Sequence, residues 1–326
     1  MRRLAALAAL ALAACSSSAA SPDEDRLLGV SVPLDARRPT VNHVGALNYA
    51  GGLVLTAPGT SLLGGLSGLE STGGDTLSDI QLTAVSDQGE QFTFRVDATD
   101  GLKLADGGRV TTARLTENGA PLGGKSDADA EDITRLDDGS LLVSFERRHR
   151  IVRYAPDGRD APFAAPQVAL PENLGFEAIA LLPLTGRQVL AVGAEDGRIW
   201  FCNAETGRAC SLFTKGTPGL GYMLTGLDHL PGTADLVATY RYYDPVRGMR
   251  AVVAWISTGV TSGRQPRRVE LARLAPPLTV DNIEGVAAVA LPGRGWRLFL
   301  VSDNNFSEKQ RTLLLAFDWL PKQPPA

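Results

Sequence analysis

The chain has few of the residues that nucleophilic or thiolate chemistry requires, with three histidines and three cysteines among 326 residues. No Gly-x-Ser-x-Gly elbow is present, because Ser67 is followed by a glycine but the first glycine is missing from its required place. The sequence therefore disfavours a serine hydrolase. A zinc site is also disfavoured, because Cys202 and Cys210 have no third or fourth ligand nearby.

Long hydrophobic runs and basic stretches are also lacking. Beyond the N-terminus no segment approaches 18 uncharged apolar residues, so the sequence predicts no membrane-spanning helix there. The net charge is −4, and it becomes −6 when the two arginines of the first 14 residues are removed (−4 − 2). A mildly acidic chain without an extended basic run excludes nucleic acid as an expected partner.

The N-terminus predicts an exported lipoprotein. Arg2 and Arg3 precede an uncharged apolar stretch, residues 4–14, which is too short to span a bilayer and is typical of a signal peptide. The sequence Leu-Ala-Ala-Cys that follows resembles a lipobox, in which the thiol of Cys15 accepts a diacylglycerol. Since Ser16 is not the aspartate of an inner-membrane retention signal, we expect an outer-membrane anchor facing the periplasm. An ordinary signal peptide with a chance cysteine is the alternative.

These features divide the chain into a signal peptide (1–14), a lipidated polar tether (15–25), one folded domain (26–320) and a C-terminal tail (321–326). Cys202 and Cys210 flank a predicted hairpin turn. In an oxidising cell envelope this spacing favours a disulfide, and two half-buried free thiols are the alternative.

Turn spacing and composition favour an all-β fold. Short apolar runs are bracketed by turn residues, and the chain contains 35 glycines and 20 prolines. Five weak repeats each contain an acidic residue, two apolar strands and a polar end, and their spacings of 46 to 61 residues are typical of four-stranded propeller blades. The leading acids are Glu70, Glu131, Glu177, Asp228 and Glu284. We predict a β-propeller of five or six blades. In the six-bladed alternative, residues 43–57 complete a sixth blade together with the C-terminal strand; a pair of β-sandwich sheets is the rival architecture.

Several motifs follow one another in the order of a known family. They include Gly-Gly-Leu-Ser-Gly-Leu-Glu at 64–70, Ser-Asp-Gln-Gly at 86–89, Phe-Glu-Arg at 145–147, Asn-Leu-Gly-Phe-Glu-Ala at 173–178, Asp-Asn-Ile-Glu-Gly at 281–285 and Ser-Asp-Asn-Asn-Phe at 302–306. Over residues 45–320 the chain resembles the phytase-like domain family, "esterase-like activity of phytase". The resemblance implies a single, often exported propeller domain and, by its name, phosphoester hydrolysis. The chain departs from the family at Gln88, where an arginine is usual.

The leading acids are the candidate functional residues. In a propeller the inner strand of each blade lines the central channel, so the five acids are expected to converge there. Crowded carboxylates take up protons, pair with arginine or bind a cation, and hard oxygen ligands suit Ca²⁺. The candidate metal ligands are Glu70, Glu131, Glu177, Glu284 and Asp303, and the candidate phosphate-binding residues are Arg147, Arg241 and Arg311.

Two functions remain open at this stage. The first is a calcium-assisted phosphoesterase of the envelope acting on a phosphorylated small molecule, with catalytic residues not identified. The second is a non-catalytic propeller that binds a ligand or a protein partner at the outer membrane. In that case the carboxylates accept backbone hydrogen bonds and seal the channel, and the Asp303 segment is a tight turn rather than a calcium loop.

Overall fold

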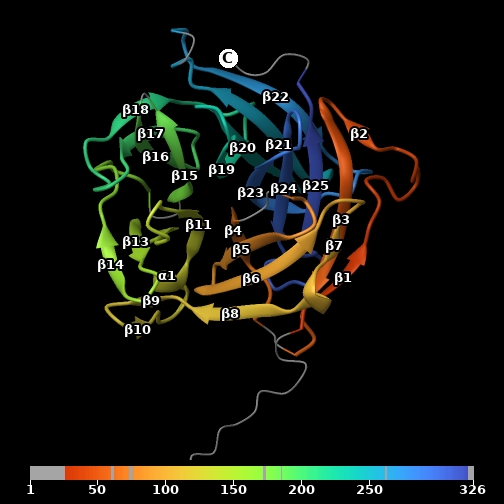
Figure 1. Ribbon diagram of the computed structural model, residues 1–326, viewed down its shortest axis with the longest axis horizontal. Coiled ribbons are helices and arrows are strands. Elements are labelled where there is room, and N and C mark those ends of the chain that lie inside the picture. Colours follow the sequence, from red (N-terminus) through yellow and green to blue (C-terminus); the bar gives the residue numbers. More distant parts are fainter. Residues whose placement is uncertain are drawn as a thin grey trace, which may run out of the picture.

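The computed structural model describes residues 26–59, 62–72, 76–171, 174–184, 186–260 and 263–321. Within these ranges, five antiparallel sheets surround one axis, and the innermost strand of each sheet lies at the centre (Figure 1). The fold is a five-bladed β-propeller, which confirms the predicted all-β class. No helix in the described part of the chain is both long and apolar enough for a membrane crossing. The predicted signal peptide, Cys15 and the tether lie outside the described residues.

Four blades follow the chain in order, each starting from its inner strand. Blade 1 contains β4 (Leu66–Thr72), β5 (Ile80–Ser86), β6 (Glu90–Asp97), β7 (Lys103–Leu104) and β8 (Val110–Arg114). Blade 2 contains β11 (Ala130–Arg135), β12 (Leu141–Phe145), β13 (Arg150–Tyr154) and β14 (Asp160–Phe163). Blade 3 contains β15 (Phe176–Leu184), β16 (Arg187–Ala194), β17 (Ile199–Asn203) and β18 (Ser211–Thr214). Blade 4 contains β19 (Met223–His229), β20 (Leu236–Asp244), β21 (Gly248–Ser257) and β22 (Arg267–Leu274).

The fifth blade joins the two ends of the described chain. Its strands, from the inside outwards, are β23 (Asn282–Ala290), β24 (Trp296–Asp303), β25 (Leu313–Trp319), β3 (Leu47–Thr56) and β1 (Leu28–Ser31), with β2 (His43–Val44) pairing to β3. Residues 43–57 therefore lie in the same sheet as the C-terminal strand, as expected, but this sheet is the fifth blade; of the two blade numbers predicted, five is the one observed. The C-terminal repeat supplies three strands of its own, so β3 takes the fourth place by pairing antiparallel with β25.

Short elements fill the connection between blades 1 and 2. They are a 3₁₀ turn, η1 (Asp106–Gly108), a two-stranded hairpin of β9 (Thr116–Glu117) and β10 (Ala120–Pro121), and the one-turn helix α1 (Lys125–Ala128). The helix places Lys125 beside the central channel.

The hydrophobic core is divided among the gaps between neighbouring blades. Leu69 of blade 1 and Phe299 of blade 5 belong to one buried cluster, while Val85 of blade 1 and Ile133 of blade 2 belong to another. Further clusters join blades 2 and 3, blades 3 and 4, and blades 4 and 5. Because each blade buries both faces against its neighbours, the side chains left for function are those at the ends of the strands and along the axis.

Candidate functional site

A one-residue bulge interrupts every inner strand close to its start. The strand register shifts by one residue between the neighbours of the extra residue, which is Ser67 in β4, Glu131 in β11, Glu177 in β15, Thr225 in β19 and Glu284 in β23. A bulge turns a side chain out of the regular alternation of the strand. The glutamates of blades 2, 3 and 5 therefore occupy the same level of the ring.

Glycine follows the bulge where the inner strands approach one another most closely. A Cβ atom on Gly68 would lie 2.6 Å from the Cα atom of Asp132 in blade 2, and one on Gly285 would lie 3.0 Å from the carbonyl carbon of Gly68. Side chains do not fit at these places, so the channel is narrow below the bulges and the space above them forms a cup.

Glu70 and Asp228 differ from the predicted ring of five acids, because each lies three residues beyond the bulge of its strand. The carboxylate of Asp228 accepts backbone hydrogen bonds from His229 at 2.6 Å and from Ala288 of blade 5 at 2.7 Å. Burial raises the pKa of Asp228 to about 7, and burial together with repulsion from Asp228 raises the pKa of Glu70 well above its usual value. Asp228 thus links blades 4 and 5 through hydrogen bonds, which agrees with the alternative that these acids accept backbone hydrogen bonds. Neither Glu70 nor Asp228 lines the cup.

A second tier of polar residues lies at the mouth end of the second strand of each blade. These residues come directly after the partner of the bulged segment and are Asp87, Glu146, Glu195, Arg241 and Asp303. All five line the cup, a pocket of about 460 Å³ at the mouth of the channel. Sequence reasoning did not assign Asp87, Glu146 or Glu195 to the site, although their signal was present: each stands at the polar end of the second strand of its repeat.

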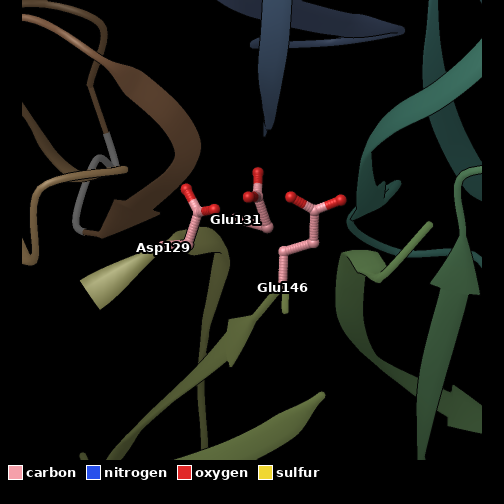
Figure 2. A group of neighbouring side chains, drawn as sticks. All are labelled: Asp129, Glu131 and Glu146. Carbon is pink, nitrogen blue, oxygen red and sulfur yellow. The ribbon is translucent and has the colours of Figure 1, made fainter. Parts of the chain in front are cut away.

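The cup is strongly acidic. Among the described residues, eight carboxylates line it: Asp87, Asp129, Glu131, Glu146, Glu177, Glu195, Glu284 and Asp303. Carboxylate oxygens of Asp129, Glu131 and Glu146 lie within 4.8 Å of one another, and their side chains point toward a common space (Figure 2). Oxygens of Glu146, Glu177 and Glu195 form a second such group. Glu146 belongs to both groups.

Three of these carboxylates lack partners. No described residue donates a hydrogen bond or an ion pair to the side chains of Glu131, Glu146 or Glu177. Burial, followed by repulsion from neighbouring acids, raises the pKa of Glu146 to about 7 and the pKa values of Glu131 and Glu177 well above their usual range. Ionised carboxylates in such surroundings require a compensating positive charge.

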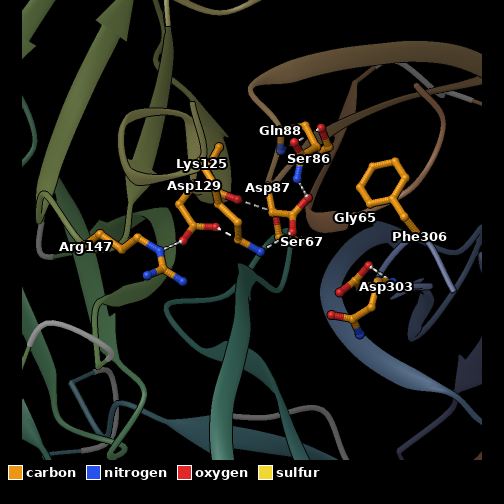
Figure 3. Close-up of polar contacts among 12 residues, drawn as sticks. Gly65, Ser67, Ser86, Asp87, Gln88, Lys125, Asp129, Arg147, Asp303 and Phe306 are labelled. Atoms are coloured by element: carbon orange, nitrogen blue, oxygen red, sulfur yellow. Dashed lines mark hydrogen bonds and ion pairs between the residues drawn. The ribbon is translucent and has the colours of Figure 1, made fainter. Parts of the chain in front are cut away.

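The predicted arginines take different places. Arg241 contacts Glu284 at 3.0 Å and Glu195 at 3.2 Å, and Glu284, whose pKa burial raises to about 8 against the opposing effect of Arg241, lies in the cup. Arg147 pairs with Asp129 at 2.5 Å on the opposite wall (Figure 3). Arg311 pairs with Asp281 at 3.5 Å and does not line the cup.

Asn282 supplies a neutral oxygen beside the acids. The residue is 4% exposed, its Nδ2 donates to Glu284 at 2.6 Å, and its Oδ1 is buried without a hydrogen-bond partner among the described residues. Amide oxygens of this kind, together with carboxylates, are ligands that Ca²⁺ accepts. Asp303, the remaining predicted ligand, also lines the cup and accepts the backbone N–H of Asn305 at 2.6 Å in a tight turn.

The two cysteines lie at the outer strands of blade 3 and not in the cup. Cys202 at the end of β17 and Cys210 before β18 form a disulfide with an S–S distance of 2.04 Å. The disulfide closes the hairpin between two outer strands of blade 3, as the sequence predicted, and neither cysteine lines the cup.

Comparison with known proteins identifies a family and distant structural neighbours. The sequence pattern of the phytase-like family, described as "Esterase-like activity of phytase", matches residues 61–306. No curated protein sequence matches the chain. The allergen Mala s 1 from Malassezia sympodialis is 14% identical, with a TM-score of 0.46 over 91% of this chain and 96% of that one. An α-L-arabinofuranosidase from Lactobacillus brevis is 11% identical, with a TM-score of 0.46 over 79% of this chain and 94% of that one.

Proposed function

Because the chain belongs to the phytase-like family, we propose that it is a calcium-dependent phosphoesterase whose active site is the acidic cup. The observation that carries the proposal is the set of unpartnered carboxylates of Glu131, Glu146 and Glu177, which converge on open space at the mouth of the ring. A purely structural role would give these groups backbone or arginine partners, as it does for Asp228.

The donor set fits calcium. Asp129, Glu131 and Glu146 would hold one ion, with all ligands being the oxygen atoms that hard cations prefer. A bound calcium ion would neutralise part of the acidic charge and polarise a phosphate group. Without it, the cup would repel any phosphorylated substrate, because eight carboxylates outnumber the three basic side chains among the described lining residues.

The chain's own residues then position the ester. Lys125 lies 2.8 Å from Asp87, and Arg147 lies 2.5 Å from Asp129, so both positive charges lie at the wall formed by blades 1 and 2. These charged donors suit phosphate oxygens. In the hydrolysis, the oxygen of water bonds to phosphorus as the ester P–O bond breaks. A cup carboxylate accepts the proton that the water loses and passes it to the leaving oxygen, so that the alcohol departs neutral.

Calcium dependence is the direct test. We expect purified protein to hydrolyse at least one phosphoester in a panel in the presence of calcium, and a chelator to reduce the rate by about 100-fold or more. Isothermal titration of the metal-free protein with calcium measures the binding separately. Absence of both turnover and calcium binding would refute the proposal, whereas calcium binding without turnover would favour the alternative, a ligand-binding propeller.

The proposed location is the cell envelope, where a lipid on Cys15 would anchor the mature protein to the outer membrane. The support is the short basic and apolar leader that ends in a lipobox-like sequence. We expect mass spectrometry of the membrane-extracted protein to show a mature chain that begins with a diacylglyceryl cysteine. A Cys15→Ser variant should lose this modification and leave the membrane fraction; an unmodified N-terminus beyond residue 15 in the wild type would contradict the anchor.

A further inference from the structure

One wall of the cup is apolar. Besides its charged groups, the cup is lined by Leu174, Met223, Tyr243 and Met249. Three of these four side chains come from the mouth end of blade 4, and Leu174 lies just before β15 of blade 3. The rest of the mouth has a different character: blades 1 and 2 and the helix α1 present Asp87, Lys125, Asp129 and Arg147 (Figure 3).

Strand register places the apolar residues beside Arg241. Arg241 and Tyr243 are two residues apart on β20, so their side chains leave the same face of the sheet. Met223 lies opposite Arg241 on β19, and Met249 lies opposite Tyr243 on β21. Directly opposed residues of antiparallel strands share a face. The apolar wall is therefore continuous with the arginine that contacts Glu195 and Glu284.

These side chains are accessible to a ligand. Tyr243 is 58% exposed and Met223 is 36% exposed, so a ligand in the cup can contact both side chains. Methionine adapts its shape to a ligand, and tyrosine offers a flat ring with little entropy to lose. Both properties favour contact with an apolar or aromatic group.

From this two-sided cup we infer the substrate class: a phosphoester with a single phosphate whose alcohol part is apolar or aromatic and lies against Met223, Tyr243 and Met249. The inference rests on the proposed function and deepens it. The phosphate lies toward the carboxylate groups and Lys125, while the leaving alcohol lies over blade 4. Hydrolysis breaks the P–O bond to that alcohol, which departs with a proton as water supplies the new oxygen on phosphorus.

Charge balance argues against substrates with many phosphates. The three basic side chains of the described lining each contact a carboxylate: Lys125 with Asp87, Arg147 with Asp129, and Arg241 with Glu284. Each added phosphate brings more negative charge into a cup that is already acidic. A polyphosphorylated sugar alcohol would also place hydroxyl groups, rather than carbon, against the apolar wall, where they lose hydrogen bonds to water.

The test compares three esters in the presence of calcium: 2-naphthyl phosphate, glycerol 2-phosphate and inositol hexakisphosphate. We expect kcat/KM for 2-naphthyl phosphate to exceed that for glycerol 2-phosphate by about 10-fold or more, since the aromatic group buries apolar surface. The double variant Tyr243→Ser with Met249→Ser should reduce this ratio by about 10-fold, mainly through KM. Val246→Ser is the matched control, because Val246 is 93% exposed in the turn that joins the same two strands and does not line the cup.

Binding of 2-naphthyl phosphate, followed by its fluorescence, separates this inference from the proposed function. Calcium-dependent turnover of all three esters at similar kcat/KM, unaffected by the double variant, would overturn the inference and leave the phosphoesterase standing. If no ester is hydrolysed but 2-naphthyl phosphate binds and the double variant weakens its binding, the apolar wall is a ligand site and the enzymatic function fails. Absence of both turnover and binding would overturn both.

Discussion

Replacing Arg241 with methionine is expected to lower the free energy of unfolding by about 3–5 kcal/mol at pH 9, the usual cost of removing one partner from a buried ion pair. The guanidinium is 29% exposed and lies between Glu195 and Glu284, which are 6% and 12% exposed as side chains. Methionine keeps much of the volume but leaves both carboxylates without a positive neighbour. The melting temperature should fall by about 5–10 °C.

The stability lost in the Arg241→Met variant should depend on pH, and the direction follows from the pKa values of Glu195 and Glu284. Burial raises the pKa values of Glu284, to about 8, and of Glu195, while Arg241 opposes both shifts. Removing the arginine raises both values further. A carboxyl whose pKa is higher in the folded state contributes stability that is fully present below its unfolded pKa and is lost as the pH rises through its folded pKa. The variant should therefore lose most stability above pH 8 and little near pH 4.

Thermal denaturation of the metal-free protein at pH 9 and pH 5 measures this effect. Arg159→Met is the control, because the Arg159 pair with Asp157 has the same kind of partner at 2.7 Å but lies at the surface, with the arginine 84% exposed. Exposed pairs contribute little to stability, so this variant should melt close to the wild type at both pH values. Equal losses for the two arginine variants, or a loss at Arg241 that is the same at pH 5 and pH 9, would contradict the assignment of Arg241 as the charge that neutralises Glu195 and Glu284.

The propeller was predictable from the sequence because its repeats are set by local turns. Short apolar strands separated by glycine-containing turns, recurring at 46 to 61 residues, carry the blade pattern without any knowledge of distant contacts. Blade number was not predictable in the same way. The pairing of Leu47–Thr56 with Leu313–Trp319 joins segments from opposite ends of the domain, and nothing in either segment states which sheet it will complete.

Among the leading acids of the repeats, the site was predictable only where charge and bulge coincide. Glu131, Glu177 and Glu284 are both the leading acids of their repeats and the extra residues of their bulges, and the structure brings them to the cup. In blades 1 and 4 the bulged residues are Ser67 and Thr225, so an alignment based on charge selects acids three residues further on. A bulge depends on how the neighbouring strand pairs, which no single strand sequence reveals.

The largest functional effect is expected from Glu146→Gln, because Glu146 is the carboxylate common to both groups of candidate ligands. Calcium affinity should fall by about 100-fold or more, which corresponds to about 2.7 kcal/mol, and phosphoester turnover should fall with it. The metal-free variant should be at least as stable as the wild type at pH 8. Burial raises the pKa of Glu146 to about 7, so the charged carboxylate disfavours folding at that pH and glutamine does not.

This difference in direction distinguishes a lost ligand from a damaged fold. Glu70→Gln is the matched control, since Glu70, on the inner strand β4, likewise has a pKa raised by burial but does not line the cup. We expect it to bind calcium like the wild type and to melt at an equal or higher temperature at pH 8, because the amide removes the repulsion with Asp228. Calorimetric titrations of both variants decide the matter: equal calcium affinities for Glu146→Gln and Glu70→Gln would mean that the cup is not the metal site, whatever the rate of hydrolysis. Weaker binding in Glu146→Gln alone, with no loss of melting temperature, would assign the shared carboxylate to the ion, because a general weakening of the ring would affect both variants.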